Sequence, residues 1–248
     1  MSTEKTEGIV IKQTDFSETS RVVTFYTRDH GKISTVAKGA RRLKGPFEAA
    51  IDLLAASRIV FIRKSSSSLD ILTEAQFISR FRPNGRSLGS LYGGYYVAEL
   101  LLGLTEEYDP HPVLYDEAIR VLACLSEDTD EKLPVLRFEL VTLREIGQLP
   151  SVDVCLVCNE PVENAGTYAI WVTQGGLICR NCQKQEYSGN RIQAGTIAIF
   201  RRLAGETESA WKNIKISPQQ FKELRKISTS AICHALDRRP KMLRYLQN

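Results

Sequence analysis

The sequence lacks the short motifs by which common catalytic and nucleotide-binding sites are recognised. It has no G-x-x-x-x-G-K-[ST] phosphate loop, no G-x-G-x-x-G after a strand, no G-x-S-x-G turn and no H-E-x-x-H pair. The three histidines, His30, His111 and His234, are too scattered to name a general base and a residue that orients it. We therefore expect a protein that is not an enzyme and has no small-molecule substrate.

Long apolar runs and disulfide patterns are also missing. No apolar run approaches the roughly 20 residues that span a bilayer, and residues 1–8 do not resemble a signal peptide. This predicts a cytoplasmic protein without a membrane partner. Four of the six cysteines form two close pairs, which favours reduced thiols or thiolate ligands over a secreted disulfide framework.

The net charge of +4 hides three regions of different sign. Residues 1–82 hold 14 Lys or Arg against 9 Asp or Glu, residues 99–163 hold 4 against 15, and residues 180–248 hold 14 against 5. The acidic middle would repel a phosphate backbone, whereas the two basic ends would attract one. Any contact with DNA is therefore expected on the ends of the chain.

The first 82 residues have the pattern of short strands. Alternating, β-branched and aromatic residues predict strands at 8–13, 21–27, 32–37, 57–63 and 69–74. Five short strands favour a small closed barrel, for which the OB-fold is the common solution. The segment 83–87 (PNGRS) breaks this pattern. An OB-fold DNA-binding domain is therefore predicted over residues 1–82.

The remainder, residues 83–248, has mainly helical periodicity. Apolar residues recur at helical spacing over 91–107, 112–125, 133–146, 193–204 and 218–236. Residues 150–188 interrupt this spacing and are rich in strand and turn residues. The predicted class is α+β, with a five-stranded OB-fold barrel followed by a mainly α-helical domain that carries a four-cysteine zinc-finger insertion.

The four paired cysteines are the sharpest signal. Cys155-x-x-Cys158 is followed, after twenty residues, by Cys179-x-x-Cys182. Each pair lets two thiolates converge from one tight turn, and two turns complete a tetrahedral zinc site. The redox alternative needs a thioredoxin-like βαβ pattern, which this stretch does not show. We expect one structural Zn²⁺, because four protein ligands leave no open position for a substrate.

A basic loop over 38–45 is the second signal. Its cations are Lys38, Arg41, Arg42 and Lys44, and flanking glycines would permit close approach of a phosphate chain. A solvated loop without a ligand is the alternative. Three aromatic residues could stack on bases, although strand aromatics more often belong to a core: Phe16, Phe25 and Tyr26.

The sequence resembles the RecO family of recombination mediators along nearly its whole length. The resemblance rests on the joint order of motifs rather than on any single one. These motifs are GIVI (8–11), ETSR (18–21), TRDHGK (27–32), VAKGAR (36–41), YYVAELL (95–101), RFEL (137–140), GQLP (147–150), both cysteine pairs, and PKMLR (240–244).

That resemblance implies an adaptor that makes and breaks no bond. Family members bind single- and double-stranded DNA, anneal complementary strands, and with RecR load RecA onto DNA coated by the single-strand-binding protein SSB. Lys38 and Arg41 match the family's basic loop, and Arg21 matches a basic position of the second strand. Arg137 is a candidate for binding the acidic C-terminal tail of SSB. A bacterial, nucleoid-associated protein is implied.

Two other functions share some of these features. A zinc-ribbon, sequence-specific DNA-binding regulator would need a recognition element for the major groove, and residues 218–236 are only a weak candidate. A metal-dependent nuclease would need clustered carboxylates, whereas the acidic residues of the middle region follow no ligand-like spacing.

Overall fold

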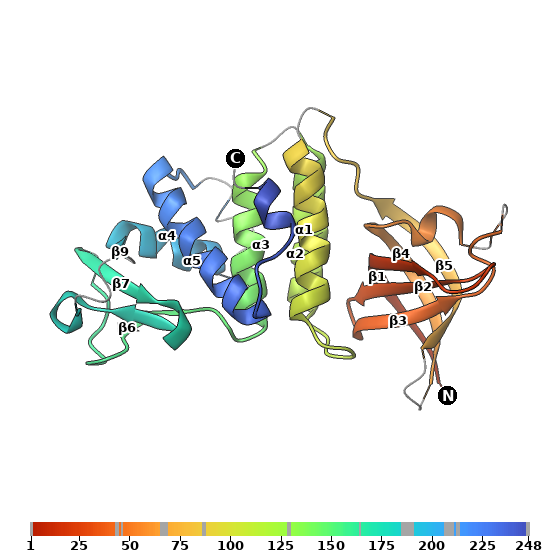
Figure 1. Cartoon of the computed structure of the whole chain (residues 1–248), viewed down its shortest axis with the longest axis horizontal. Helices are drawn as coiled ribbons and strands as arrows, with labels where there is room; N and C mark the ends of the chain where they lie inside the picture. The colour runs from red at the N-terminus through yellow and green to blue at the C-terminus, as the bar shows by residue number, and fades with distance from the viewer. Residues whose placement is uncertain are drawn as a thin grey trace. The chain divides into compact units, whose positions relative to one another are not determined.

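A computed structural model gives the architecture of the chain (Figure 1). The residues that it describes are 2–42, 45, 47–64, 69–85, 88–127, 130–163, 165–184, 191–205, 211 and 214–246. The chain divides into two compact units, which we call the barrel unit (Met1–Val135 with Pro240–Asn248) and the knuckle unit (Leu136–Arg239). The first two helices associate with the barrel, and the domain boundary between residues 82 and 83 remains a prediction.

The barrel unit begins with five strands that pair in a closed ring. They are β1 (Ser2–Asp15), β2 (Arg21–Thr27), β3 (Gly31–Ala37), β4 (Ala55–Arg63) and β5 (Asp70–Arg80), in the order β1-β2-β3-β5-β4. All neighbours are antiparallel except β3 and β5. The predicted five-stranded, OB-like domain is therefore confirmed.

β1 and β5 exceed their predicted ranges by the most residues. β1 begins at Ser2 because it pairs with β4 from Ser2 opposite Arg63 onward, and β5 continues to Arg80 along the same strand. The side chains of these extensions are mostly polar and do not alternate between buried and exposed positions. Backbone pairing with β4, rather than side-chain burial, therefore extends the two strands. The barrel core is apolar and includes Val10, Phe25, Ile33, Ile59, Phe61 and Leu72.

Helices α1 (Leu88–Leu104) and α2 (Pro112–Ser126) join the barrel through specific polar contacts. Lys32 Nζ donates to the carbonyl oxygens of Leu102, at 2.9 Å, and Thr105. These contacts satisfy carbonyls at the end of α1, which ends three residues earlier than predicted. Arg28 forms a two-point ion pair with Asp116 of α2, with both N–O distances 3.0 Å.

The C-terminal segment is ordered by α1. A 3-10 helix, η5 (Met242–Tyr245), follows Pro240, and the Glu99 carboxylate accepts the backbone N–H groups of Lys241 and Met242 at 2.7 and 2.9 Å. A carboxylate at the start of a helix satisfies donors that lack partners within the helix. The basic C-terminal segment therefore belongs to the barrel unit.

The knuckle unit combines three helices with a small sheet. α3 (Lys132–Glu145) leads into it, and α4 (Ala194–Ala204) and α5 (Pro218–Leu236) follow the sheet. The sheet has the order β6-β8-β7-β9, with β6 (Ser151–Cys155), β7 (Thr167–Trp171), β8 (Gly176–Ile178) and β9 (Arg191–Gln193). A capping box between Ser217 and Gln220 starts α5. The β-rich insertion is confirmed.

No described helix is both long and apolar enough to cross a bilayer.

Candidate metal centre and nucleic-acid interface

The four paired cysteines converge in the knuckle unit. Cys155 ends β6 and Cys158 follows in a tight turn. Just after β8, Cys179 precedes the 3-10 helix η3 (Arg180–Cys182), and Cys182 is the last residue of that helix. Their four Sγ atoms all lie within 4.8 Å of one another, and the Cys158 and Cys179 Sγ atoms are 3.8 Å apart. A regular tetrahedron with Zn–S bonds of about 2.3 Å has edges of about 3.8 Å. The site therefore has the size of a four-thiolate metal centre.

Backbone N–H donors stabilise the thiolate form of one of these sulfurs, Cys155 Sγ. The N–H groups of Val157 and Cys179 donate to Cys155 Sγ at 3.4 and 3.3 Å. Burial of the Cys155 thiol raises its pKa, but backbone N–H donors outweigh burial and lower the pKa to about 6. The pKa of Cys182 is raised to about 12, first by its hydrogen bond with Cys179. Thiols that share protons in this way can exchange them for a metal ion.

The sulfurs lie on a very small apolar core. Buried Cys155, Ala169 and Ile178 form its centre, and Trp171, Cys179 and Cys182 pack against it. The strands that carry this cluster are only three to five residues long, so a cross-link between the two cysteine turns would add to their stability. The arrangement suits a structural metal, since four thiolates fill every tetrahedral position.

At one end of the barrel, the basic loop is tied to the turn between β1 and β2. The backbone N–H of Arg41 donates to the Thr19 carbonyl oxygen at 3.1 Å, and Arg41 Nη1 donates to the Ser17 carbonyl oxygen at 2.9 Å. Gly39 adopts the left-handed conformation, with a φ of 77°, and Arg42 N–H closes a turn onto its carbonyl at 3.1 Å. The two loops thus form one ordered surface, which we call the basic end.

Asp15 organises the cations of the basic end. Its carboxylate oxygens lie 3.1 Å from Arg21 Nε and 3.6 Å from Arg41 Nη2. Because Asp15 is 57% exposed, these pairs orient the arginines more than they stabilise the fold. Sequence reasoning missed Asp15, since the first strand was predicted to end at Gln13. Asp15 lies opposite Arg21 in the pairing of β1 with β2, and extending the predicted first strand to residue 15 would have indicated this pair.

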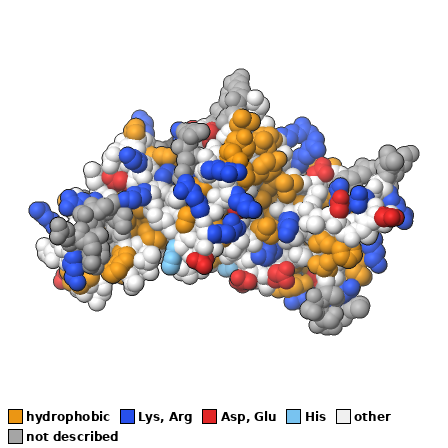
Figure 2. Space-filling model, viewed as in Figure 1, with side chains coloured by type: hydrophobic (Ala, Val, Ile, Leu, Met, Phe, Trp, Pro, Cys, Tyr) orange, Lys and Arg blue, Asp and Glu red, His pale blue; other side chains and the backbone are white. Residues whose placement is uncertain are grey.

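Lys38 and Arg42, two further predicted cations of the basic end, are exposed. Lys38 and Arg42 have no ion pair with any residue that the structure describes, and Lys44 lies outside the described residues. On the face drawn in Figure 2, Lys and Arg side chains lie over the barrel among Asp and Glu side chains. The structure therefore brings Arg21, Lys38, Arg41 and Arg42 together at one end of the barrel.

The three aromatic candidates have different environments. Phe25 and Tyr26 are fully buried, which excludes them from stacking on bases and assigns them to the core. Phe16 lies in the turn between β1 and β2 and is 60% exposed. Among these three residues, only Phe16 remains available as a stacking platform at the basic end.

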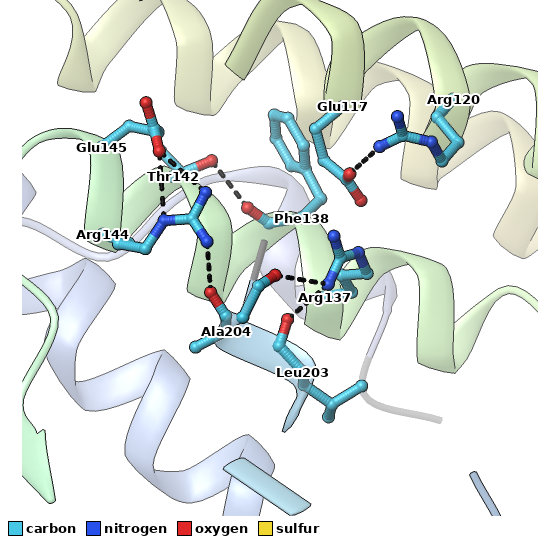
Figure 3. A network of polar contacts seen from close by, with 10 residues as sticks. Glu117, Arg120, Arg137, Phe138, Thr142, Arg144, Glu145, Leu203 and Ala204 are labelled. Atoms are coloured by element: carbon cyan, nitrogen blue, oxygen red, sulfur yellow. Dashed lines mark hydrogen bonds and ion pairs between the residues drawn. The ribbon is translucent and has the colours of Figure 1, made fainter. Parts of the chain in front are cut away.

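Arg137 of α3 lies inside the knuckle unit, only 2% exposed (Figure 3). Its Nη1 donates to the carbonyl oxygens of Leu203 and Gly205 at 2.7 and 3.3 Å, and Arg144 Nη1 donates to that of Ala204 at 2.5 Å. Both cations thus satisfy carbonyls at the C-terminal end of α4, where positive charge is favourable. The predicted contact of Arg137 with a partner protein remains a prediction.

Comparison with known proteins identifies the family. Residues 1–81 match the model described as Recombination protein O N terminal, and residues 86–244 match Recombination protein O C terminal. The chain is 39% identical over 202 residues to DNA repair protein RecO of Rhodopirellula baltica, covering 81% of this chain and 75% of that protein. It is 31% identical over 249 residues to DNA repair protein RecO of Syntrophus aciditrophicus, covering 99% and 95%. The chain belongs to the RecO family of DNA repair proteins.

Proposed function

We propose that this protein is a recombination mediator that binds single- and double-stranded DNA and anneals complementary strands. With RecR, it would help to load RecA onto single strands coated by SSB, and it would act in the cytoplasm at the bacterial nucleoid. The observation that supports this function best is the basic end, where Lys38, Arg41 and Arg42 follow β3 on a loop tied to the turn before Arg21 of β2.

The mechanism follows from charge neutralisation. Cations that contact phosphates release condensed counterions, and that release favours binding without reading base sequence. Phosphate contacts leave the base edges free, and neutralising two backbones lowers the repulsion that opposes pairing. Asp15 offsets part of the positive charge but fixes the guanidinium groups of Arg21 and Arg41 in direction. Binding should therefore be independent of sequence and should weaken steeply with salt.

Zn²⁺ is the ion that we propose for the metal centre. Four thiolates at tetrahedral separation favour zinc over the hard cations magnesium and calcium, which prefer oxygen ligands. Cys155, Cys158, Cys179 and Cys182 would hold the ion. When bound, it supplies a cross-link between the two cysteine turns and no catalytic chemistry.

Partner proteins are the third part of the proposal. RecR would bind together with DNA, and Arg137 would bind the acidic C-terminal tail of SSB. Because Arg137 donates to the carbonyls of Leu203 and Gly205, it would have to exchange these acceptors for a carboxylate. The tail would then compete with the end of α4 for the same guanidinium group.

Annealing of complementary oligonucleotides, with and without SSB, tests the proposed function. We expect the wild-type protein to accelerate annealing of both naked and SSB-coated strands, and the Lys38→Glu, Arg42→Glu double variant to lose most of this acceleration. The Lys5→Glu, Lys215→Glu double variant is a control of equal charge, because both lysines are exposed and neither belongs to the basic end. A strong preference for one duplex sequence at constant salt would instead identify a sequence-specific regulator.

A further inference from the structure

A cleft of about 440 Å³ lies in the knuckle unit, away from the four cysteine sulfurs. The end of β7 and the 3-10 helix η2 (Val172–Gln174) line one side, and the first half of α5 lines the other. Arg191 of β9 is also part of the lining. None of these elements contributes to the basic end, so the cleft is a separate feature of the molecule.

The cleft is positively charged. Arg191, Lys222 and Lys226 line it and are exposed, whereas Glu223 is its one acidic lining residue among those described. The Glu223 carboxylate accepts hydrogen bonds from Thr196 Oγ1 at 2.6 Å, Gln193 N–H at 3.3 Å and Gln219 Nε2 at 3.0 Å. The lining therefore holds three cations against one carboxylate, and the excess of positive charge favours an anionic ligand.

An aromatic side chain also lines the cleft, opposite the α5 helix that carries Lys222 and Lys226. Trp171 ends β7, is half-buried, and lines the cleft together with Val172 and Ile227. It also packs against the small core that carries Cys155, Cys179 and Cys182. The metal centre therefore supports one wall of the cleft directly. An indole face beside several cations is the combination that binds unpaired bases and their phosphates.

We propose that this cleft is a second binding site for single-stranded DNA, with a base stacked on Trp171 and phosphates held by Arg191, Lys222 and Lys226. The inference rests on the proposed function, which gives DNA as the ligand and annealing as the reason for a second site. A protein that pairs two strands has to hold both of them, and the basic end accounts for one. The cleft supplies a site for the other strand on a different compact unit.

The two tryptophans of the chain allow a direct test. In a Trp211→Phe background, Trp171 is the only tryptophan, and its fluorescence reports on the cleft. We expect oligo(dT) of about 15 nucleotides to quench this fluorescence saturably and in a salt-dependent way. The Arg191→Glu, Lys222→Glu, Lys226→Glu variant should bind at least about tenfold more weakly by this signal. Lys215→Glu is the control, since Lys215 is exposed and is not part of the lining.

The same signal separates this site from the basic end. Quenching that persists in the Lys38→Glu, Arg42→Glu variant would support a second site, even if annealing is lost. Absence of quenching in a protein whose circular dichroism is native would overturn the inference while leaving the basic end untouched. Quenching by a short acidic peptide but not by oligo(dT) would also overturn it, because the cleft would then be a protein-docking site.

A conservative substitution of Trp171 tests whether a loss of binding comes from lost stacking or from a disturbed fold. Trp171→Phe keeps an aromatic face, whereas Trp171→Ala removes it. Fluorescence anisotropy of labelled oligo(dT) measures cleft binding in the Lys38→Glu, Arg42→Glu background. We expect Trp171→Phe to keep the affinity and Trp171→Ala to lower it by about tenfold or more. Equal binding by both variants would contradict the stacking role of Trp171.

Discussion

The basic end and the metal centre stabilise short loops in different ways. The basic end belongs to a closed barrel with a large apolar core. Backbone hydrogen bonds and the ion pairs of Asp15 together order the loops of the basic end. The metal centre belongs to a sheet with strands of three to five residues, and its sulfurs pack on a cluster centred on Cys155, Ala169 and Ile178. Strands this short gain more from a cross-link than the long strands of the barrel do.

Metal removal should separate the two regions most strongly. Structural zinc contributes about 10–16 kcal/mol of binding energy to small zinc modules, so the knuckle sheet should unfold locally without it. We expect Cys155→Ala or chelation to abolish hydrogen-exchange protection over β6 to β8 and leave the barrel strands protected. Cys124→Ala is the control, because Cys124 lies on α2, outside the cysteine cluster. Unchanged protection after metal loss would contradict the comparison.

Loss of a buried cation should have the next largest effect. Arg137→Leu leaves the carbonyls of Leu203 and Gly205 without this donor, which should cost about 1–3 kcal/mol of unfolding free energy. Urea unfolding measured with a probe in the knuckle unit would show the change. Arg202→Leu, an exposed position of α4, should change stability by less than about 0.5 kcal/mol. Equal effects would show that Arg137 does not stabilise α4.

A smaller effect is expected from Asp15. Asp15→Asn removes the negative charge beside Arg21 and Arg41, so single-strand affinity at low salt should rise by about two- to threefold. Asp52→Asn is the matched control, because Asp52 also pairs with one arginine of the barrel, Arg80, at 3.6 Å. Fluorescence anisotropy of labelled oligonucleotide measures both. A fall in affinity for Asp15→Asn would show that orienting the arginines matters more than their net charge.

Local patterns predicted most of the fold. Alternation of apolar residues located the five strands, and helical periodicity located α2, α3 and α5 to within about two residues. The cysteine spacing predicted the cluster of four sulfurs, because each C-x-x-C turn brings two thiolates together without help from distant residues. The ends of β1 and β5 were missed because they depend on pairing with β4, which is a long-range contact.

The remaining features depend on contacts between residues distant in sequence. The burial of Arg137 follows from the end of α4, 66 residues downstream of it at Leu203. The cleft joins Trp171 to Lys222 from elements separated by the whole of β8, β9 and α4. Periodicity and spacing describe neighbours along the chain, so neither could have predicted these juxtapositions.

Single-strand affinity as a function of salt concentration tests the central claim most directly. Lys38, Arg41, Arg42 and Lys44 would be changed together to Glu, and compared with a variant of equal charge in which exposed Lys5, Arg82, Lys184 and Lys215 are changed. For the basic-end variant we predict an affinity at least about 100-fold lower, and a log–log salt slope shallower by about 0.7 for each lost phosphate contact. Unchanged affinity and slope in a folded protein would contradict the account.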